Sequence, residues 1–600
     1  MSSERGILAA GALAVGVSFA YGFACLLLPP GRRHWLTLSV VTLGLSLGAL
    51  TLIMFWIAWL SPGRLNAPVV ALACAAVGGL GLYLARGQAR PDRPPDGAGR
   101  FAWTRDPFNT ALVASVAVLS AAILFNAVYW PFSDWDALAI YAPIGRRIFE
   151  SGALPTGFLY ESYPMLVPLA YAYAHGAAGA VNESWARLVP ALMAVGAAAT
   201  AGAIAREMLS WRAGLAAAAL VVLTPLFGRW ASSGYVDVPT AFYIALAALG
   251  AWRWLQSRRR ADALLTGLAA GLAMWTKSAA LTLCLSLAAL VALRAWVDRR
   301  QLVDAPRPAV PAGTAWMAIG ILATAGPFYA RNLAAFGSLL PDTIWTSLAR
   351  HDLASLLIML DPRQHFLATG WLYTASLVYG VVSLGRGFRR VTVWHLLVAF
   401  VAPFLAAWWW LASYDARFLV MIVPLLAVMA GLMVEEVIRH RASKPNPKQV
   451  RRAGWIGVFL VLAMVPFALH KAVIGKRAIL QNPAMTSADK HRLLLGGAYD
   501  LALAVNMLPT GSRVVGVPIS TRYHLDTPHL NASSEAPAAG PPWEVADDFD
   551  FAVYQTDEGL RPPWASGIPT VFETPDGYFL YSTEVSRPPA SHMDSPADGE

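Results

Sequence analysis

Residues 109–130 read NTALVASVAVLSAAILFNAVYW and are followed directly by PFSDWD at 131–136. The first stretch carries no charged side chain, and its length lies within the roughly 17 to 25 residues that a helix needs to cross a bilayer. The second stretch places two aspartates, Asp134 and Asp136, just after that helix. We therefore predict a transmembrane helix that opens into a polar loop.

The composition extends this pattern to the whole chain. Of its 600 residues, 57% are hydrophobic and only 14% are charged, which leaves too few polar side chains to cover a soluble protein. The 46 Lys and Arg exceed the 36 Asp and Glu and give a net charge of +10. Because these cations form short clusters between apolar runs, they follow the positive-inside rule and exclude a nucleic-acid-binding face.

The same length rule predicts about fourteen membrane-spanning helices, and hence an all-α polytopic membrane protein. The predicted spans are 7–29, 36–60, 67–85, 109–130, 187–206, 212–228, 236–256, 261–276, 278–296, 313–331, 367–385, 391–411, 416–438 and 454–472. The first span is too long for the apolar core of a signal peptide, so we expect it to be retained.

Arginine clusters predict the orientation of these spans. They lie at 32–33, 86–105, 206–212, 258–260, 299–300, 386–390 and 439–452. All of them fall on one side, the cytoplasm, provided that residues 163–180 do not cross. The prolines, tyrosines and histidine of YPMLVPLAYAYAHGAAGA favour a helix at the membrane interface there. Both termini and the long loop 131–186 are then extracytoplasmic.

The chain divides into four predicted parts. Residues 1–108 hold three extra N-terminal transmembrane helices and a cytoplasmic linker, and residues 109–472 form the main transmembrane domain, including the outer loop 131–186. Residues 473–585 form a small α/β domain, because SRVVGV, DFAVYQ and GYFLYS alternate as strands do. Residues 586–600, rich in Pro, Ser and acids, form a disordered tail.

Asp134 and Asp136 are the first candidates for chemistry. A carboxylate at the membrane surface can take a proton from an acceptor hydroxyl or hold a divalent cation such as Mg²⁺ or Mn²⁺. It can equally cap the amphipathic helix that follows in the sequence. We assign Asp136 as the base and Asp134 as a cap or a supporting group.

Asp237 and Lys277 lie at predicted outer helix ends. Asp237 is a candidate acid, and the alternative is an ordinary helix N-terminus with Pro239 in its first turn. Lys277 stands between two apolar helices with no acid within ten residues in the sequence. Its ammonium therefore either binds an anion or extends to the interface.

Arg331 and Arg417 repeat the pattern of a lone cation at an outer helix end. Asp415 is the neighbour that would neutralise Arg417 if the pair were structural. The alternative is that Lys277, Arg331 and Arg417 together bind a phosphate. Further candidates for contacts with substrate are Tyr141, Arg146, Tyr163 and Arg187.

No firm cofactor follows from the sequence. Cys25, Cys74 and Cys284 all lie in apolar stretches, so we expect neither a disulfide framework nor a redox site. No group of His and Glu has the spacing of zinc ligands. A divalent cation at Asp134 and Asp136 stays open.

Seven segments, taken in order, resemble the GT-C glycosyltransferase superfamily, in the branch of protein O-mannosyltransferases and lipid A aminoarabinose transferases. They are SDWDALAIYAPIGRRIFESG (133–152), YPMLVPLAYA (163–172), ESWARLVPALMAVGAAATAGAIAREM (183–208), GYVDVPTAFYIALAAL (234–249), GLAAGLAMWTKSAAL (267–281), GPFYARNLAAFG (326–337) and DARFLVMIVPLLAVMAG (415–431). The similarity covers about 109–472 and implies a GT-C-like catalytic helical bundle.

The resemblance also implies an activity. The acid of the family's first outer loop falls on Asp136 or Asp134, the second acid on Asp237, and the phosphate-binding cations on Lys277 and Arg417. Such an enzyme moves a hexose or pentose from a polyprenyl phosphate to a hydroxyl of an envelope glycan, lipid or protein, with inversion. The implied place is the outer face of a bacterial inner membrane. Asp-Trp-Asp stands where protein mannosyltransferases have Asp-Glu, so the acceptor stays open.

Three other functions remain. An oligosaccharide polymerase or ligase that uses a pyrophosphate-linked glycan would need arginines spaced for two phosphates. A transporter of a lipid-linked substrate would show internal repeats and charges at mid-membrane. The C-terminal domain would bind the acceptor glycan if Trp543 and Trp564 stack on sugars, whereas loop tryptophans more often pack a small core.

Overall fold

The computed structural model describes residues 3–31, 33–87, 106–157, 160–301, 310–341, 347–361, 365–385, 392–441, 447–526, 542–545, 548–556, 561–565 and 568–584. Contacts divide the chain into a membrane unit, Met1–Trp130 with Ile144–Lys476, and a C-terminal unit, Pro131–Pro143 with Arg477–Glu600. The predicted disordered tail, 586–600, lies outside the described residues.

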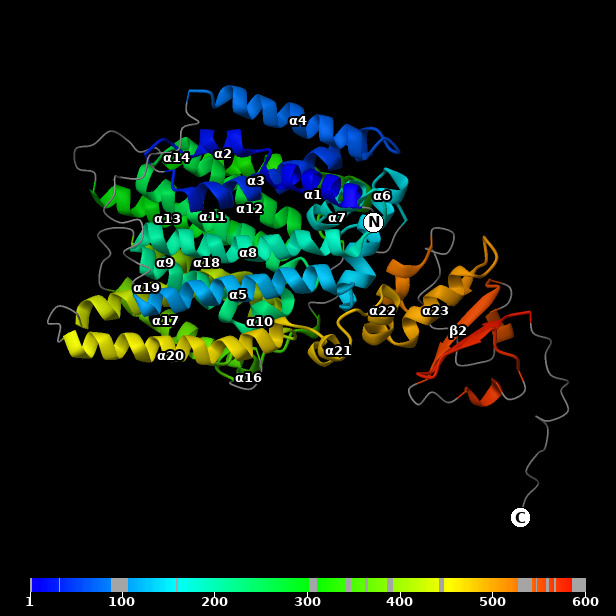
Figure 1. Cartoon of the computed structure of the whole chain (residues 1–600). Coiled ribbons are helices and arrows are strands. Elements are labelled where there is room, and N and C mark those ends of the chain that lie inside the picture. The colour runs from blue at the N-terminus through cyan, green and yellow to red at the C-terminus, as the bar shows by residue number, and fades with distance from the viewer. Residues whose placement is uncertain are drawn as a thin grey trace, which may run out of the picture. The chain divides into compact units, whose positions relative to one another are not determined.

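The membrane unit is a bundle of helices (Figure 1). Its α-helices are α1 (Ser3–Ser18), α2 (Tyr21–Leu27), α3 (Trp35–Leu60), α4 (Ala67–Leu84), α5 (Pro107–Tyr129), α6 (Ala142–Ser151, which begins at the boundary of the units), α7 (Leu166–Ala178), α8 (Glu183–Met208), α9 (Trp211–Leu223), α10 (Pro225–Trp230), α11 (Asp237–Ser257), α12 (Arg260–Thr276), α13 (Leu283–Gln301), α14 (Val310–Thr324), α15 (Gly326–Phe336), α16 (Leu353–Leu356), α17 (Ala368–Leu384), α18 (Val393–Leu411), α19 (Val423–Arg441) and α20 (Pro447–Ala472). Short 3₁₀ helices are η3 (Ser278–Thr282), η5 (Ile358–Leu360) and η6 (Ala416–Ile422).

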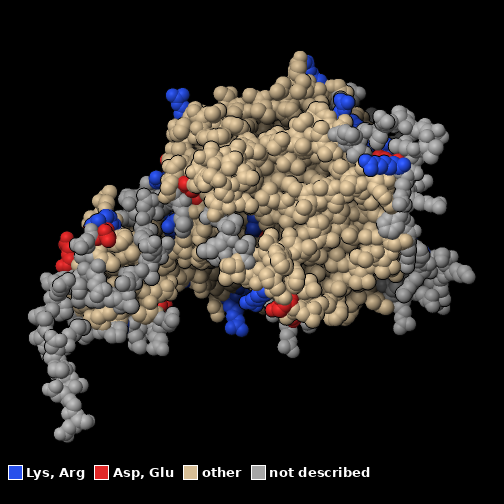
Figure 2. Space-filling view, turned by 180° about the vertical axis from the view of Figure 1, so that it is seen from behind, with Lys and Arg blue, Asp and Glu red and all other residues tan. Residues whose placement is uncertain are grey.

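Ten helical stretches among the described residues are long and apolar enough to cross a membrane. Each coincides with a predicted span, and the other four predicted spans fall on the shorter helices α9, α12, α14 with α15, and α17. On the face seen in Figure 2, charged side chains lie mainly around the margins of a broad uncharged surface. The prediction of an all-α, multi-pass membrane protein is confirmed, and the count of about fourteen spans stays a prediction.

The N-terminal helices are packed into the membrane unit. Gly44 of α3 lies against Phe242 and Leu246 of α11, and its carbonyl accepts a hydrogen bond of 3.0 Å from the Tyr243 hydroxyl. Farther along α3, the Thr51 hydroxyl accepts from the Trp275 indole of α12 at 3.2 Å. Because α3 contacts both helices that end at the candidate site, it forms part of the framework that positions that site.

Helix α7 falls within the segment predicted to remain at the interface. It has thirteen residues, fewer than a span needs, and nearly all of them are buried. At its end, Nδ1 of His175 accepts the backbone N–H of Asn182 at 3.0 Å, and burial lowers the pKa of His175 to about 4. The neutral ring therefore closes the turn into α8.

The C-terminal unit contains a small mixed sheet, in the order β1-β2-β4-β3. Its strands are β1 (Val514–Val515), β2 (Phe551–Gln555), β3 (Phe572–Glu573) and β4 (Tyr578–Ser582). Strand β1 runs parallel to β2, and β4 pairs antiparallel with β2 and β3. The three segments predicted as strands contain β1, β2 and β4, so the predicted α/β character is confirmed.

Both faces of this sheet are covered. The unit's helices are α21 (Lys476–Gln481), α22 (Ser487–Leu495), α23 (Gly497–Asn506) and the 3₁₀ helices η7 (Ile519–His524), η9 (Pro542–Val545) and η10 (Pro563–Ala565). Leu501 and Val505 of α23 pack against one face of the sheet. Trp564 packs against Tyr554 and Tyr581 on the other. Trp564 is therefore a partly buried residue that packs against the core, and the side chain of Trp543 lies outside the described part of the chain.

Segment Pro131–Pro143 clusters with this unit although it follows α5 in the sequence. Its residues Ala137–Tyr141 form a π-helical turn, η2, that packs against η7. The rings of Phe132 and Tyr523 meet edge to face with centroids 5.3 Å apart. π-Helices are rare, and their single turns frequently occur at functional sites.

Candidate functional site

Asp237 is the centre of a buried charge cluster in the membrane unit. It is the first residue of α11, after the turn Ala231–Val236 that leads from α10. Its side chain is only 1% exposed, and its Oδ1 accepts a hydrogen bond of 2.7 Å from Nζ of Lys277. The carboxylate of Asp237 thus forms an ion pair with Lys277. The alternative, in which Asp237 is only an ordinary residue of a helix N-terminus, does not explain this contact.

Lys277 reaches Asp237 because the chain breaks between α12 and η3. Lys277 itself is extended, with φ −154° and ψ 134°, and separates the two helices. This break aims the side chain of Lys277 inward, where it is 16% exposed. Its ammonium also lies 4.2 Å from the ring centroid of Phe418, at cation–π distance.

Arg417 approaches the same carboxylate from η6. Its Nε lies 3.8 Å from Oδ2 of Asp237 and 3.3 Å from a carboxylate oxygen of Asp415. Asp415 also caps η6, because its side chain accepts the backbone N–H of Arg417 at 2.7 Å. Asp415 is therefore a counter-ion of Arg417, as the structural alternative predicted, and it is also the N-cap of η6.

Three aromatic rings surround the guanidinium of Arg417. Its central carbon lies 4.6 Å from the ring centroid of Tyr235, 5.1 Å from that of Phe418 and 5.3 Å from that of Trp230. The rings of Trp230 and Tyr235 stack on each other at 4.9 Å. Our sequence analysis missed these rings. Tyr235 lies in the same motif as Asp237, and Phe418 lies in the same motif as Arg417.

The balance of charge in this cluster favours an anion. Two cations, Lys277 and Arg417, converge on one fully buried carboxylate, whereas the second acid, Asp415, is 34% exposed and screened by solvent. Buried ions are tolerated only when they are paired, so Asp237 is the buried counter-charge of the two cations. An incoming phosphate oxygen offers the same charge-assisted contacts as that carboxylate.

Arg331 lies elsewhere. It donates to the backbone carbonyl of Glu161 at 2.8 Å, and its neighbour Asn332 donates to that of Ser162 at 2.8 Å. The guanidinium also stands over the ring of Phe336 at 5.2 Å. These contacts hold segment 160–163 to α15, and none of them joins Arg331 to the cluster at Asp237.

The additional candidates have separate surroundings. Arg146 pairs with Glu150 on its own helix at 2.7 Å, and Tyr163 packs on Tyr160 with ring centroids 5.1 Å apart. Tyr141 is buried in η2. Arg187 is completely buried in α8 and donates to two backbone carbonyls.

Asp134 and Asp136 belong to the C-terminal unit. Asp134 is 8% exposed, and its backbone carbonyl accepts from the N–H of Leu138. Asp136 directly precedes η2 and is partly exposed. Within the described residues, neither belongs to a group of three or more side chains able to hold a metal, so the divalent cation stays a prediction.

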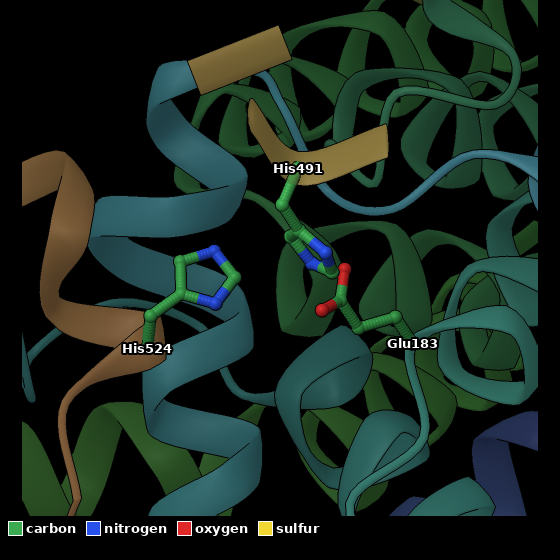
Figure 3. A group of neighbouring side chains, drawn as sticks. All are labelled: Glu183, His491 and His524. Atoms are coloured by element: carbon green, nitrogen blue, oxygen red, sulfur yellow. The ribbon is translucent and has the colours of Figure 1, made fainter. Parts of the chain in front are cut away.

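Histidines add a second polar feature to the C-terminal unit. The rings of His491, on α22, and His524, at the end of η7, meet edge to face with centroids 4.9 Å apart (Figure 3). Tyr499 of α23 stacks on His491 at 4.6 Å. Glu183, also drawn in Figure 3, is the first residue of α8 and belongs to the membrane unit.

Comparison with characterised families gives one sequence match. Residues 162–322 match the family described as dolichyl-phosphate-mannose-protein mannosyltransferase. This region holds Arg187, Asp237 and Lys277. No curated protein sequence matches the chain.

Solved structures match the fold over most of the chain. ArnT of Cupriavidus metallidurans bound to undecaprenyl phosphate aligns with a TM-score of 0.54 and 16% identity, over 81% of this chain and 99% of that one. The same protein in its apo state aligns with a TM-score of 0.50 and 16% identity, over 79% and 98% of the two chains. At such low identity these matches show the fold alone.

Proposed function

We propose, on the premise that this chain is a membrane glycosyltransferase of the GT-C superfamily, that it transfers a sugar from a polyprenyl phosphate to an acceptor hydroxyl. The observation that carries the proposal is the convergence of Lys277 and Arg417 on the single buried carboxylate of Asp237. Two cations beside a single buried acid in a multi-pass membrane protein suit an anionic group borne on a lipid tail.

The donor class is supported by one neighbour. ArnT of C. metallidurans, which shares the fold, was crystallised with undecaprenyl phosphate. A prenyl tail would stay in the bilayer while its phosphate meets Lys277 and Arg417, displacing the carboxylate of Asp237. We leave Arg331 out of this step, because Arg331 and its neighbour Asn332 donate hydrogen bonds to segment 160–163.

The reaction follows from these roles. The acceptor hydroxyl attacks the anomeric carbon, the bond from that carbon to the phosphate oxygen breaks, and the configuration inverts. Asp136 takes the hydroxyl proton, with Asp134 as its supporting neighbour; this assignment is supported by the sequence motif. The leaving polyprenyl phosphate keeps both bonding electrons, and Lys277 and Arg417 stabilise the charge that it gains. A phosphate leaves readily enough that no general acid is required.

The proposed setting is the outer face of a bacterial inner membrane. We assign the turn between α11 and α12 to the cytoplasm because it carries clustered arginines, and the opposite ends of the helices then carry Asp237, Lys277 and Arg417. The acceptor is an envelope glycan, lipid or protein, and the sugar is a hexose or a pentose.

The test measures transfer of label from radioactive undecaprenyl-phosphate sugars to envelope acceptors by the purified full chain. We expect Lys277→Ala and Asp136→Asn each to lower turnover by about 10² or more, the scale of oxyanion and acid–base groups. Lys471→Ala, an exposed lysine of α20, is the matched control and should stay within twofold of wild type.

Two results would overturn the proposal. Equal turnover in wild type, Lys277→Ala and Asp136→Asn would remove the assigned roles. Transfer only from pyrophosphate-linked glycans, with none from monophosphate donors, would make the chain an oligosaccharide polymerase or ligase.

A further inference from the structure

We infer that Arg187 is a positioning residue that sets the geometry of the turn carrying Tyr235 and leading into Asp237. The inference rests on the proposed function and goes beyond it, because it concerns the two backbone carbonyls that Arg187 binds and not the charge cluster itself. It concerns only residues of the membrane unit.

Arg187 binds two backbone carbonyls that are far apart in the sequence. One terminal nitrogen of its guanidinium donates to the carbonyl of Trp130 and the other to that of Ser232. The side chain is completely buried. A planar guanidinium suits this task because its two terminal nitrogens point in fixed directions, whereas an ammonium is a single point of charge.

Each of the two carbonyls lies at an end of a helix or in a turn between helices. Trp130 is the C-cap of α5, where the helix dipole is negative and a cation is favoured. Ser232 lies in the turn Ala231–Val236 between α10 and α11. Arg187 therefore ties the end of α5 to the turn that precedes Asp237, and a buried cation so placed is difficult to relocate.

A second buried donor holds the same turn. The hydroxyl of Tyr171, on α7, donates to the carbonyl of Gly234 at 2.6 Å. Within the turn, the Ser233 hydroxyl donates to the carbonyl of Trp230 at 2.9 Å and accepts the N–H of Tyr235 at 3.2 Å. The backbone is thus fixed from α7 and from α8 at neighbouring residues.

The turn positions two residues of the site, Tyr235 and Asp237. Tyr235 places its ring 4.6 Å from the guanidinium carbon of Arg417, and two residues later Asp237 takes its hydrogen bond from Lys277. A shift of this backbone would move both groups together. Misplacement by about 1 Å costs as much as 10²-fold in rate when catalysis depends on alignment.

The first experiment compares Arg187→Met with Arg187→Lys in the transfer assay, using undecaprenyl-phosphate sugar as the probe. We expect kcat to fall by about 10²-fold in Arg187→Met while KM changes by less than about threefold, and Arg187→Lys to restore part of kcat. Arg212→Met, which removes an ion pair with Asp106 whose side chains are 32% and 35% exposed, is the matched control and should leave kcat within twofold.

The second experiment follows hydrogen exchange of the backbone amides of residues 231–237 in the full-length chain. We expect faster exchange at Ser233 and Tyr235 in Arg187→Met than in wild type, with α5 and α11 protected to the same extent in both. Tyr171→Phe should act on the same amides, and its effect on kcat should be less than additive with that of Arg187→Met.

The outcomes separate this inference from the proposed function. Unchanged kcat in Arg187→Met, or a loss of activity that only follows the loss of folded protein with unchanged exchange at 231–237, would overturn the inference and leave the function standing. If wild type transfers no sugar, the proposed function fails. In that case hydrogen exchange of the amides of 231–237 alone tests the positioning role. Faster exchange in Arg187→Met than in wild type supports the role, and equal exchange rejects it.

Discussion

Asp237 and Asp415 face the same guanidinium, yet their environments give them different roles. Asp237 is buried and lies beside both cations, so its electrostatic attraction to them is strong. Asp415 is 34% exposed, and water weakens its attraction to Arg417. The buried acid should therefore compete with a phosphate, and the exposed one should mainly fix the start of η6.

This competition can be measured with Asp237→Asn. The amide keeps the shape of the side chain but removes its charge, so a phosphate no longer competes with the Asp237 carboxylate for Lys277 and Arg417. We expect undecaprenyl phosphate to bind about tenfold more tightly, about 1.4 kcal/mol, in an equilibrium binding assay in nanodiscs. Asp415→Asn should change the affinity by much less. Weaker binding to Asp237→Asn would show instead that the carboxylate is needed to hold the cations in place.

At the scale of elements, the close packing of α12 against α14 helps to position Lys277, which directly follows α12. Glycines at Gly267 and Gly271 of α12 and Gly320 of α14 let the two backbones approach closely. A Cβ added at Gly267 would lie closer than 3.0 Å to backbone atoms of Met317, which cannot rotate away. Because α12 ends at Thr276, the position of Lys277 depends on this contact.

Gly267→Ala should therefore lower the free energy of unfolding by about 1–3 kcal/mol, the usual cost of overpacking. The measurement is the midpoint of thermal unfolding in detergent. Gly79→Ala is the control, since a Cβ there meets nothing within 4 Å in the middle of α4. The prediction is wrong if both variants unfold at the same temperature.

At the scale of the whole molecule, the predicted orientation of the chain in the membrane can be tested directly. Met507 is 84% exposed in the C-terminal unit, and Arg259 is exposed between α11 and α12. In a chain that also carries Cys284→Ser, we expect Met507→Cys to react with a membrane-impermeant maleimide in spheroplasts. Arg259→Cys should react only after permeabilisation. The reverse pattern would place the proposed site in the cytoplasm.

Much of the architecture was predictable because its causes are local. A helix that spans a bilayer must satisfy its own backbone hydrogen bonds, so an apolar run such as 109–130 predicts a helix without knowledge of its neighbours. The strands β2 and β4 were equally visible, because alternation of side chains is a property of the strand itself. The small C-terminal sheet could therefore be predicted, although not its strand order.

The partners of the charges were not predictable. Lys277 has no acid near it in the sequence, and only the approach of α11 to the end of α12 brings Asp237 within 2.7 Å. Arg187 resembled a candidate for substrate binding, yet its helix turns it into the interior, onto two carbonyls. In both cases the packing of neighbouring helices decides the role of the side chain.

The sequence by itself determined that this chain crosses a membrane many times, carries a small α/β domain near its end and bears isolated charges at helix ends. Those features follow from hydrophobicity and periodicity, which act within one segment. Only the tertiary structure decided that Lys277 and Arg417 share one buried acid among aromatic rings, while Arg331 serves a different segment. Such pairings depend on helix packing across long stretches of sequence, where burial makes each unpaired charge too costly to leave alone.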